Sequence, residues 1–189
     1  MKMKISFSLL LVLAFLAGPV SVFAQDDDAK PDCQTIDDAD ALKNFEKSKD
    51  RKKYNWEERK AFLQEALKAQ PDWAEANLAM AKMIMTKAKA DGNEGNYPAA
   101  IPFLKAAVDN CPKIGAEPFY QLGTQLYLIE NYKDAITYLE KYINYDTDDA
   151  KLLGQNYEFN SGQAVEMLRW AKFYVDIKNH PRPFAPSDR

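Results

Sequence analysis

The chain has 189 residues and a formal net charge of −3, with 25 basic and 28 acidic side chains interspersed along it. A nucleic-acid surface needs a basic patch or stripe, which this sequence lacks, so we expect no nucleic-acid partner. Only seven glycines occur, and runs of alternating β-branched residues are absent, which favours helices over strands.

The first 24 residues have the pattern of a secretory signal peptide. Two lysines precede an apolar run over residues 5–16, the pair Gly18-Pro19 interrupts it, and a small residue, Ala24, stands before the cleavage position. An uncleaved membrane anchor is the alternative. No later stretch approaches the roughly 20 apolar residues that a membrane-spanning helix requires. We therefore expect an exported protein, in the periplasm or on the periplasmic face of the outer membrane, with residues 25–36 forming a flexible N-terminus.

Cys33 and Cys111 are the only cysteines. A lipid anchor would need a cysteine directly at the cleavage site, and Cys33 lies well past Ala24, so we expect no lipidation. In an oxidising compartment an even number of cysteines permits a disulfide between Cys33 and Cys111. Free buried thiols are the alternative.

Three stretches repeat one another, at residues 54–72, 95–113 and 130–148. Each has an aromatic residue near its start and a leucine seven positions later. The aromatic residues are Trp56, Tyr97 and Tyr132, and the leucines are Leu63, Leu104 and Leu139. The shared frame indicates an internal repeat of helices.

Two further helices are predicted between these copies, at residues 71–90 and 115–130, because their apolar residues recur at spacings of three and four. Met80 and Met83 fall on the core side of the first, whereas Met85 is more open to a groove. Gly123, in the middle of the second, costs roughly 1 kcal/mol relative to alanine. We expect a close helix crossing there, against Ala135.

The end of the chain predicts two more helices, at roughly 148–157 and 162–178, followed by a proline-rich tail at 179–189. Five apolar residues of the second of these helices could cover the end of the helical stack. They are Leu168, Ala171, Phe173, Tyr174 and Ile177.

A helix–turn–helix unit of about 34 residues with small residues at its crossings resembles the tetratricopeptide repeat. The match is best over residues 116–149 and good over 74–112, apart from an insertion. Residues 37–71 match only in the second helix, where Arg59 replaces the expected alanine. This replacement suggests a terminal repeat with one solvent-exposed face. The matching residues of the best unit are Phe119, Leu122, Gly123 and Leu126, then Tyr132, Ala135, Leu139 and Tyr142. The resemblance implies an all-α fold, a tetratricopeptide-like α-solenoid of about three helical hairpins plus a closing C-terminal helix, over residues 37–178.

The segment KNHPRPFAP, residues 178–186, carries a second resemblance. It is similar to the junction that follows the short helical-repeat region of exported Bacteroidetes envelope proteins, where a β-propeller and sometimes a domain similar to outer membrane protein A come next. Some of those proteins serve type IX secretion or gliding. The resemblance implies either a stand-alone relative or a truncated member.

Chemistry-bearing motifs are few. The single histidine, His180, lies beside a proline in the tail, and neither cysteine has a histidine near it in the sequence. DGNEGN (91–96) lacks the acidic spacing of an EF-hand loop and reads as a solvated turn. DTDD (146–149) suits capping of the next helix through Thr147 or Asp148. We therefore expect no catalytic residue, no metal site, no cofactor, no small-molecule substrate and no enzyme activity.

The resemblance to tetratricopeptide repeats implies a groove lined by first helices. Its candidate partner-binding residues are Glu75, Leu78, Lys82 and Met85 in one repeat, and Glu117, Tyr120, Thr124 and Tyr127 in the next. Tyr120 and Tyr127 are the best anchors, because exposed tyrosines provide contact area at low entropic cost. The alternative is that both pack against neighbouring helices. The residue set that binds chaperone C-termini in some members is not present in full, so that ligand is not expected.

These observations predict a non-enzymatic exported scaffold or adaptor that binds a protein or peptide partner, in an envelope or secretion-related assembly. The alternative is a structural tether module of a larger protein associated with the outer membrane or peptidoglycan. An enzyme is the third and weakest reading.

Overall fold

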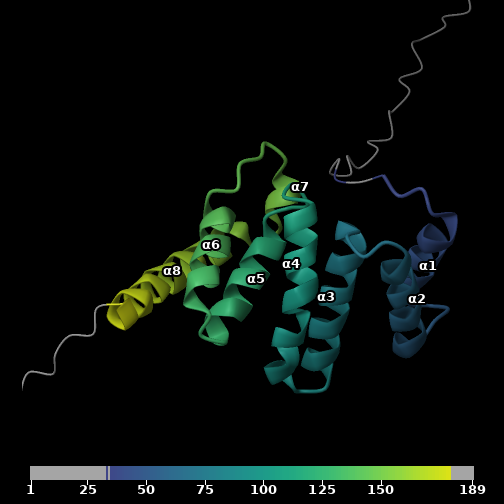
Figure 1. The fold of residues 1–189 in the computed structure, drawn as a ribbon, viewed down its shortest axis with the longest axis horizontal. Helices are drawn as coiled ribbons and strands as arrows, with labels where there is room; N and C mark the ends of the chain where they lie inside the picture. Colours follow the sequence, from purple (N-terminus) through teal and green to yellow (C-terminus); the bar gives the residue numbers. More distant parts are fainter. Residues whose placement is uncertain (1–32, 34, 180–189) are drawn as a thin grey trace, which may run out of the picture. The chain divides into compact units, whose positions relative to one another are not determined.

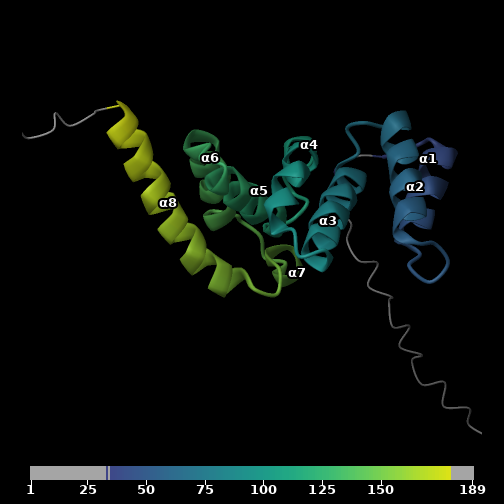
Figure 2. The same ribbon diagram turned by 90° about the horizontal axis from the view of Figure 1, so that it is seen from below.

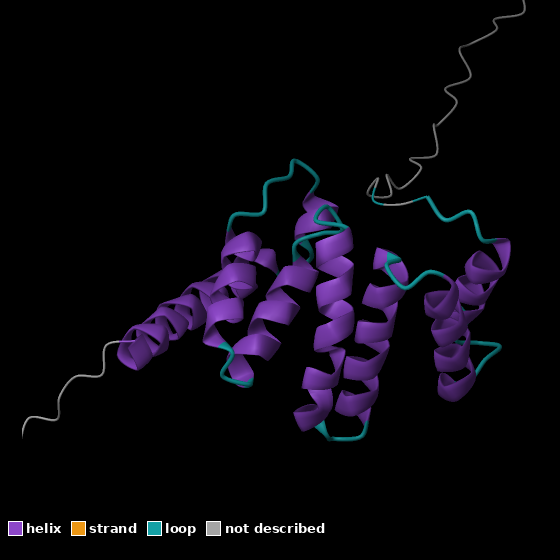
Figure 3. Ribbon diagram, viewed as in Figure 1, coloured by secondary structure: helices purple, strands orange, loops and turns teal. Residues whose placement is uncertain are grey.

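The structure is a computed structural model that describes residue 33 and residues 35–179. Over this part the chain forms eight α-helices and one 3-10 helix, with no strand (Figures 1 and 3). The prediction of an all-α fold is therefore confirmed. The expected signal peptide and nearly all of the proline-rich tail, including His180, lie outside the described residues.

The helices agree with the sequence prediction most closely in the middle of the chain. Their bounds are α1 (Ala39–Lys49), α2 (Trp56–Ala69), α3 (Ala74–Ala90), η1 (Glu94–Ala100), α4 (Ile101–Asn110), α5 (Glu117–Leu128), α6 (Tyr132–Ile143), α7 (Ala150–Leu153) and α8 (Tyr157–Asn179). Pro98 lies inside the 3-10 helix η1, just before α4. A proline removes a backbone donor, so the first turns of the predicted helix at 95–113 are 3-10 rather than α.

Local capping starts the first two helices. The Asp38 side chain accepts hydrogen bonds from the backbone N–H groups of Asp40 and Ala41, both at 2.9 Å. Asn55 and Glu58 form a reciprocal capping box at the start of α2. The repeat comparison did not locate α1. A sequence signal for it exists, because Asp38 is a capping residue type and the residues that α1 buries, at 41, 45 and 48, follow at helical spacing.

The helix predicted at 148–157 is wrong in length, because α7 has only four residues and α8 begins at Tyr157. The Leu152 carbonyl accepts a hydrogen bond from the Ala116 N–H at 2.7 Å, so it is used outside the helix. Gly154 then adopts a φ of 89°, a left-handed conformation that ends α7. The cap of α7 is Asp149, rather than Thr147 or Asp148.

The helices pack mainly with their neighbours in sequence. α1 packs with α2, α3 with α4 and α5 with α6, while fewer contacts join α2 to α3 and α4 to α5 (Figures 1 and 2). α8 packs along α6 and also contacts α5 (Figure 2). Three helical pairs followed by a long helix therefore make up the described part of the chain.

Buried side chains form two clusters. One joins α1, α2 and the first half of α3, and it contains Phe45, Leu63 and Met80. The other joins α3 to α6 and α8. Ile84 and Phe103 pack against both clusters, so the apolar interior is continuous through α3 and α4. Met80 and Met83 are buried, which confirms their predicted core positions.

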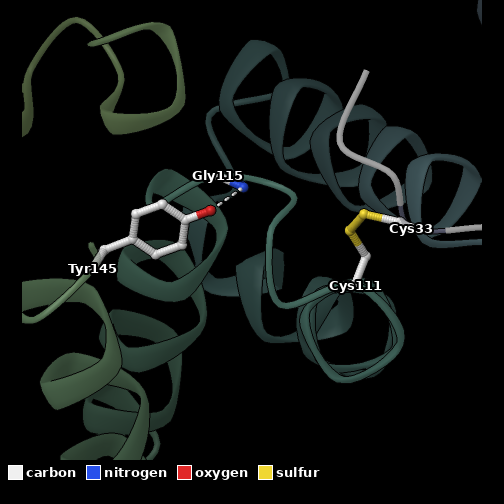
Figure 4. Close-up of a disulfide and its surroundings, with 4 residues drawn as sticks. All are labelled: Cys33, Cys111, Gly115 and Tyr145. Carbon is white, nitrogen blue, oxygen red and sulfur yellow. Dashed lines mark hydrogen bonds between the residues drawn. A yellow bond between two sulfur atoms is a disulfide. The ribbon is translucent and has the colours of Figure 1, made fainter. Parts of the chain in front are cut away.

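A disulfide joins Cys33 to Cys111, with their Cα atoms 5.1 Å apart (Figure 4). Cys111 is the C-cap residue of α4 and is buried. The bond therefore links the segment before α1 to the end of α4. Figure 4 also shows the Gly115 N–H donating to the Tyr145 hydroxyl at 3.1 Å, which joins the α4–α5 connection to the residues after α6.

The predicted close crossing at Gly123 is confirmed. The three atoms nearest to the β carbon position of Gly123 all belong to Leu139 of α6, one turn further along α6 than the expected Ala135. Leu139 and Ala135 lie on the same face of α6, because they are four residues apart.

Candidate protein-binding surface

Half of the predicted groove residues lie on α3. Lys82 is exposed, whereas Glu75, Leu78 and Met85 are half-buried. Leu78 and Met85 pack partly against the larger core cluster. This row of α3 is therefore accessible along one edge and anchored to the interior along the other.

The remaining predicted residues lie on α5. Glu117 is exposed at the start of the helix, and Tyr120, Thr124 and Tyr127 are half-buried. The row on α5 is therefore most accessible at its N-terminal end.

An ion pair joins the two rows. Lys82 Nζ lies 3.9 Å from Glu117 Oε2, with about half of each side chain exposed. Such a pair contributes only about 0–1 kcal/mol to stability, because water screens it. Its importance here is geometric, since it shows that the α3 row and the α5 row approach each other at Lys82 and Glu117.

Helix α8 occupies part of the face on which the α5 tyrosines lie. The Tyr120 hydroxyl donates to Gln163 Oε1 at 2.6 Å, and its ring lies 5.1 Å from that of Tyr142. Burial raises the pKa of the Tyr120 hydroxyl. Tyr120 thus holds α5 against α6 and α8, which agrees with the alternative that it packs on neighbouring helices.

Tyr127 is also engaged by its neighbours. Its ring packs edge-on against Tyr132 at 5.5 Å, and Tyr132 in turn stacks on Tyr174 of α8 at 4.7 Å. An aromatic chain therefore runs from α5 through α6 to α8. The accessible part of the predicted groove is centred on Lys82 and Glu117 rather than on the two tyrosines.

The covering role predicted for the apolar set of α8 is only partly correct. Ala171 is buried and Leu168 is half-buried, but Phe173, Tyr174 and Ile177 are each more than 40% exposed. The reason is that α8 turns its small residues, Ala164 and Ala171, toward the interior. Apolar spacing alone does not tell which of two apolar faces of a helix is covered.

An exposed aromatic cluster on α8 is the surface feature that sequence reasoning missed. Trp170 is 43% exposed, and its ring lies 5.7 Å from Phe173 and 6.4 Å from Tyr174. With Ile177 these residues follow the spacing i, i+3, i+4, i+7, which is a single helical face. This spacing was visible in the sequence, but the apolar face that it defines was expected to pack against the interior.

Arg59 connects the first two helices. The sequence suggested that it marks a terminal repeat with one solvent-exposed face. In the structure it is half-buried, and its Nε donates to the Ser48 carbonyl at 2.6 Å. The guanidinium therefore joins α2 to the last turn of α1. Arg59 also lines a pocket between α1, α2 and α3.

No protein-family model matches this chain, and comparisons with curated proteins and with solved structures find no match. Among the described residues, no helix combines the length and the apolar character needed to cross a membrane. The same residues contain no group of three or more histidine, cysteine, aspartate or glutamate side chains that could hold a metal ion.

Proposed function

We propose that this protein is a non-enzymatic exported scaffold that binds a protein or peptide partner through the adjoining faces of α3 and α5. The observation that carries the proposal is the Lys82–Glu117 contact, which brings the two rows of candidate residues together. Around this contact, half-buried Leu78 and Met85 provide apolar area beside exposed charges. Apolar area bordered by charged groups is the usual composition of a protein-binding surface.

The arrangement of the chain supports a repeat-type scaffold. Three sequential helix pairs and a final long helix are consistent with a tetratricopeptide-like solenoid, whose first helices line a binding face. We place the protein in the periplasm or at the periplasmic face of the outer membrane. The expected signal peptide supports that location, as does the pairing of its two cysteines.

Charge reversal at the surface tests this proposal. Lys82→Glu and Glu117→Lys are exposed substitutions and should leave the fold intact, while each should reduce the recovery of partners from the native envelope in an affinity purification. The double exchange should restore the ion pair but leave both charges reversed toward the partner. Lys133→Glu, an exposed change on α6, is the matched control. If partners are recovered equally well with every variant, the α3–α5 face is not the binding surface.

A tether module of a larger envelope protein is the second proposal. The exposed aromatic cluster of α8 favours it, because a neighbouring domain would cover Trp170, Phe173 and Ile177. An immunoblot of the native cells distinguishes the two proposals. A product much larger than the 21.5 kDa of this chain supports the tether, whereas a product of about that mass or slightly less supports the stand-alone scaffold.

A further inference from the structure

A pocket of about 290 Å³ lies where α2, α3 and the end of α1 meet. Four basic side chains line it, and no aspartate or glutamate does. They are Lys49, Arg51, Arg59 and Lys82. Because the whole chain is acidic, with a net charge of −3, this concentration of positive charge is local.

The two lysines of the pocket have carboxylate partners. Lys49 Nζ lies 2.7 Å from Glu46 Oε1, and Lys82 Nζ lies 3.9 Å from Glu117 Oε2. The two arginines pair with no carboxylate among the residues that the structure describes. Two positive charges at this pocket are therefore uncompensated.

Arg59 is held in place by the fold. Its Nε donates to the carbonyl of Ser48, a buried residue whose own hydroxyl donates to the Phe45 carbonyl. The two terminal amino groups of Arg59 have no acceptor in the described part of the chain. Burial lowers the pKa of Arg59, and the nearby positive charge of Arg51 lowers it further. Both causes reflect a guanidinium that has no neutralising partner, and Arg59 remains positively charged at neutral pH.

We propose that Arg51 and Arg59 bind a phosphate-type oxyanion, free or as a phosphomonoester. Two uncompensated guanidinium groups match a group that carries about two negative charges, whereas a carboxylate carries only one. Guanidinium groups donate paired hydrogen bonds to such oxygens. Trp56, Ala79 and Met83 also line the pocket and place apolar side chains beside the arginines. The pocket shares Lys82 with the protein-binding surface proposed above, but Arg51 and Arg59, which carry this proposal, are not among the residues of that surface.

Calorimetric titration of the full chain with sodium phosphate at pH 8 tests the site, with sodium chloride added to keep the ionic strength constant. We expect saturable binding of one phosphate per chain, with sodium acetate binding about tenfold more weakly or not at all. Glycerol phosphate, titrated in parallel, identifies the source of the ligand. Tighter binding than that of inorganic phosphate points to an esterified ligand, and weaker binding points to free phosphate. Acetate that binds as well as phosphate would overturn the assignment of a dianion.

Two substitutions locate the binding. Arg51→Gln and Arg59→Gln should each weaken phosphate binding by about tenfold or more, since each removes charge-assisted hydrogen bonds. Arg169→Gln is the matched control, because Arg169 is an exposed arginine on α8, away from this pocket, whose carboxylate partner is Glu166. Arg59 also joins α1 to α2, so thermal melting checks that variant. Arg51 is exposed in the turn before α2 and keeps the test decisive if Arg59→Gln unfolds. Absence of saturable binding, or equal binding by Arg51→Gln, would overturn the site.

Discussion

Gly123 of α5 lies so close to Leu139 of α6 that no larger residue fits between the two helices. A β carbon at Gly123 would be 2.8 Å from both Cγ and Cδ2 of Leu139, and 3.1 Å from the Leu139 backbone nitrogen. Leu139 is fully buried. A side chain at position 123 therefore requires Leu139, or the two helices, to shift within a closely packed interior.

Gly123→Leu should lower the free energy of unfolding by about 1–3 kcal/mol through overpacking. The higher helix propensity of leucine stabilises the helix by less than about 1 kcal/mol, so the destabilisation by overpacking is larger. Gly123→Ala should also destabilise, by less. Thermal melts followed by circular dichroism measure both, and exposed Lys133→Ala should leave the melting temperature nearly unchanged. A neutral or stabilising Gly123→Leu would mean that the α5–α6 crossing is not at this position.

The disulfide should make a large contribution to stability, because it closes a loop with a sequence separation of 78. The chain-entropy estimate for a loop of this size is about 4–5 kcal/mol, and measured losses of native disulfides are about 2–5 kcal/mol. Cys33→Ser should therefore lower the melting temperature by several degrees. Cys33 is the better site for substitution, because Cys111 is buried and a serine there would also bury a hydroxyl group.

A reducing agent provides the control for the disulfide. It should lower the melting temperature of the unmodified protein to near that of Cys33→Ser, and it should not affect the variant. Alkylation of the unfolded, unreduced protein followed by intact-mass measurement should find no free thiol. A melting temperature of the unmodified protein that does not change on reduction would contradict the expected contribution.

Stability should fall in alkaline solution. Burial raises the pKa of Tyr138, Tyr142 and Tyr145 above the usual value of about 10. Below pH 10 both the folded and the unfolded chains keep these protons, and the stabilisation is complete. Above about pH 10 the unfolded chain loses its protons first, so the free energy of unfolding decreases as the pH rises through the raised values.

Denaturant unfolding at a series of pH values from neutral to strongly alkaline measures this decrease. Phenolate absorbance should show that part of the tyrosine titration of the folded protein lies at higher pH than in the unfolded chain. Tyr142→Phe should make the alkaline decrease less steep, although it also removes the hydrogen bond to the Tyr157 carbonyl. Identical titrations of the folded and unfolded chains would rule out the expected pH dependence.

Asn77 should be important for the α2–α3 connection. It is buried, and its Nδ2 donates to the carbonyls of Pro71 at 2.8 Å and Trp73 at 2.9 Å. Asn77→Leu keeps a similar volume but removes both hydrogen bonds, and should cost about 1–3 kcal/mol. Denaturant unfolding measures the change, and exposed Asn96→Ala is the control. Equal stabilities of the two variants would show that the connection does not need Asn77.

Helix positions were largely predictable from the sequence because their signals are local. Spacings of three and four predicted α3 and α5 within a few residues of their observed ends, and the repeat frame predicted α2 and α6 with ends up to five residues too late. The α7–α8 boundary was not predictable in this way. It depends on the hydrogen bond from Ala116 to the Leu152 carbonyl, which joins residues 36 positions apart.

The candidate surface was less predictable than the helices. The residues expected in the groove do lie on α3 and α5, but Tyr120 and Tyr127 contact α6 and α8 as well as the surface. The exposed cluster around Trp170 and the arginine pair at residues 51 and 59 were not expected. Both depend on which face of each helix its neighbours cover.

The sequence by itself determined the helical class, the positions of most helices and the close approach of two helices at Gly123. These properties follow from interactions within one helix or between adjacent helices of the chain. Only the tertiary structure decided that Cys33 pairs with Cys111, that α8 leaves Trp170 exposed and that Arg51 and Arg59 lack acidic partners. Those outcomes depend on contacts between residues that are distant in the sequence. A local pattern is compatible with several sets of such contacts, because a helix can have more than one apolar or charged face.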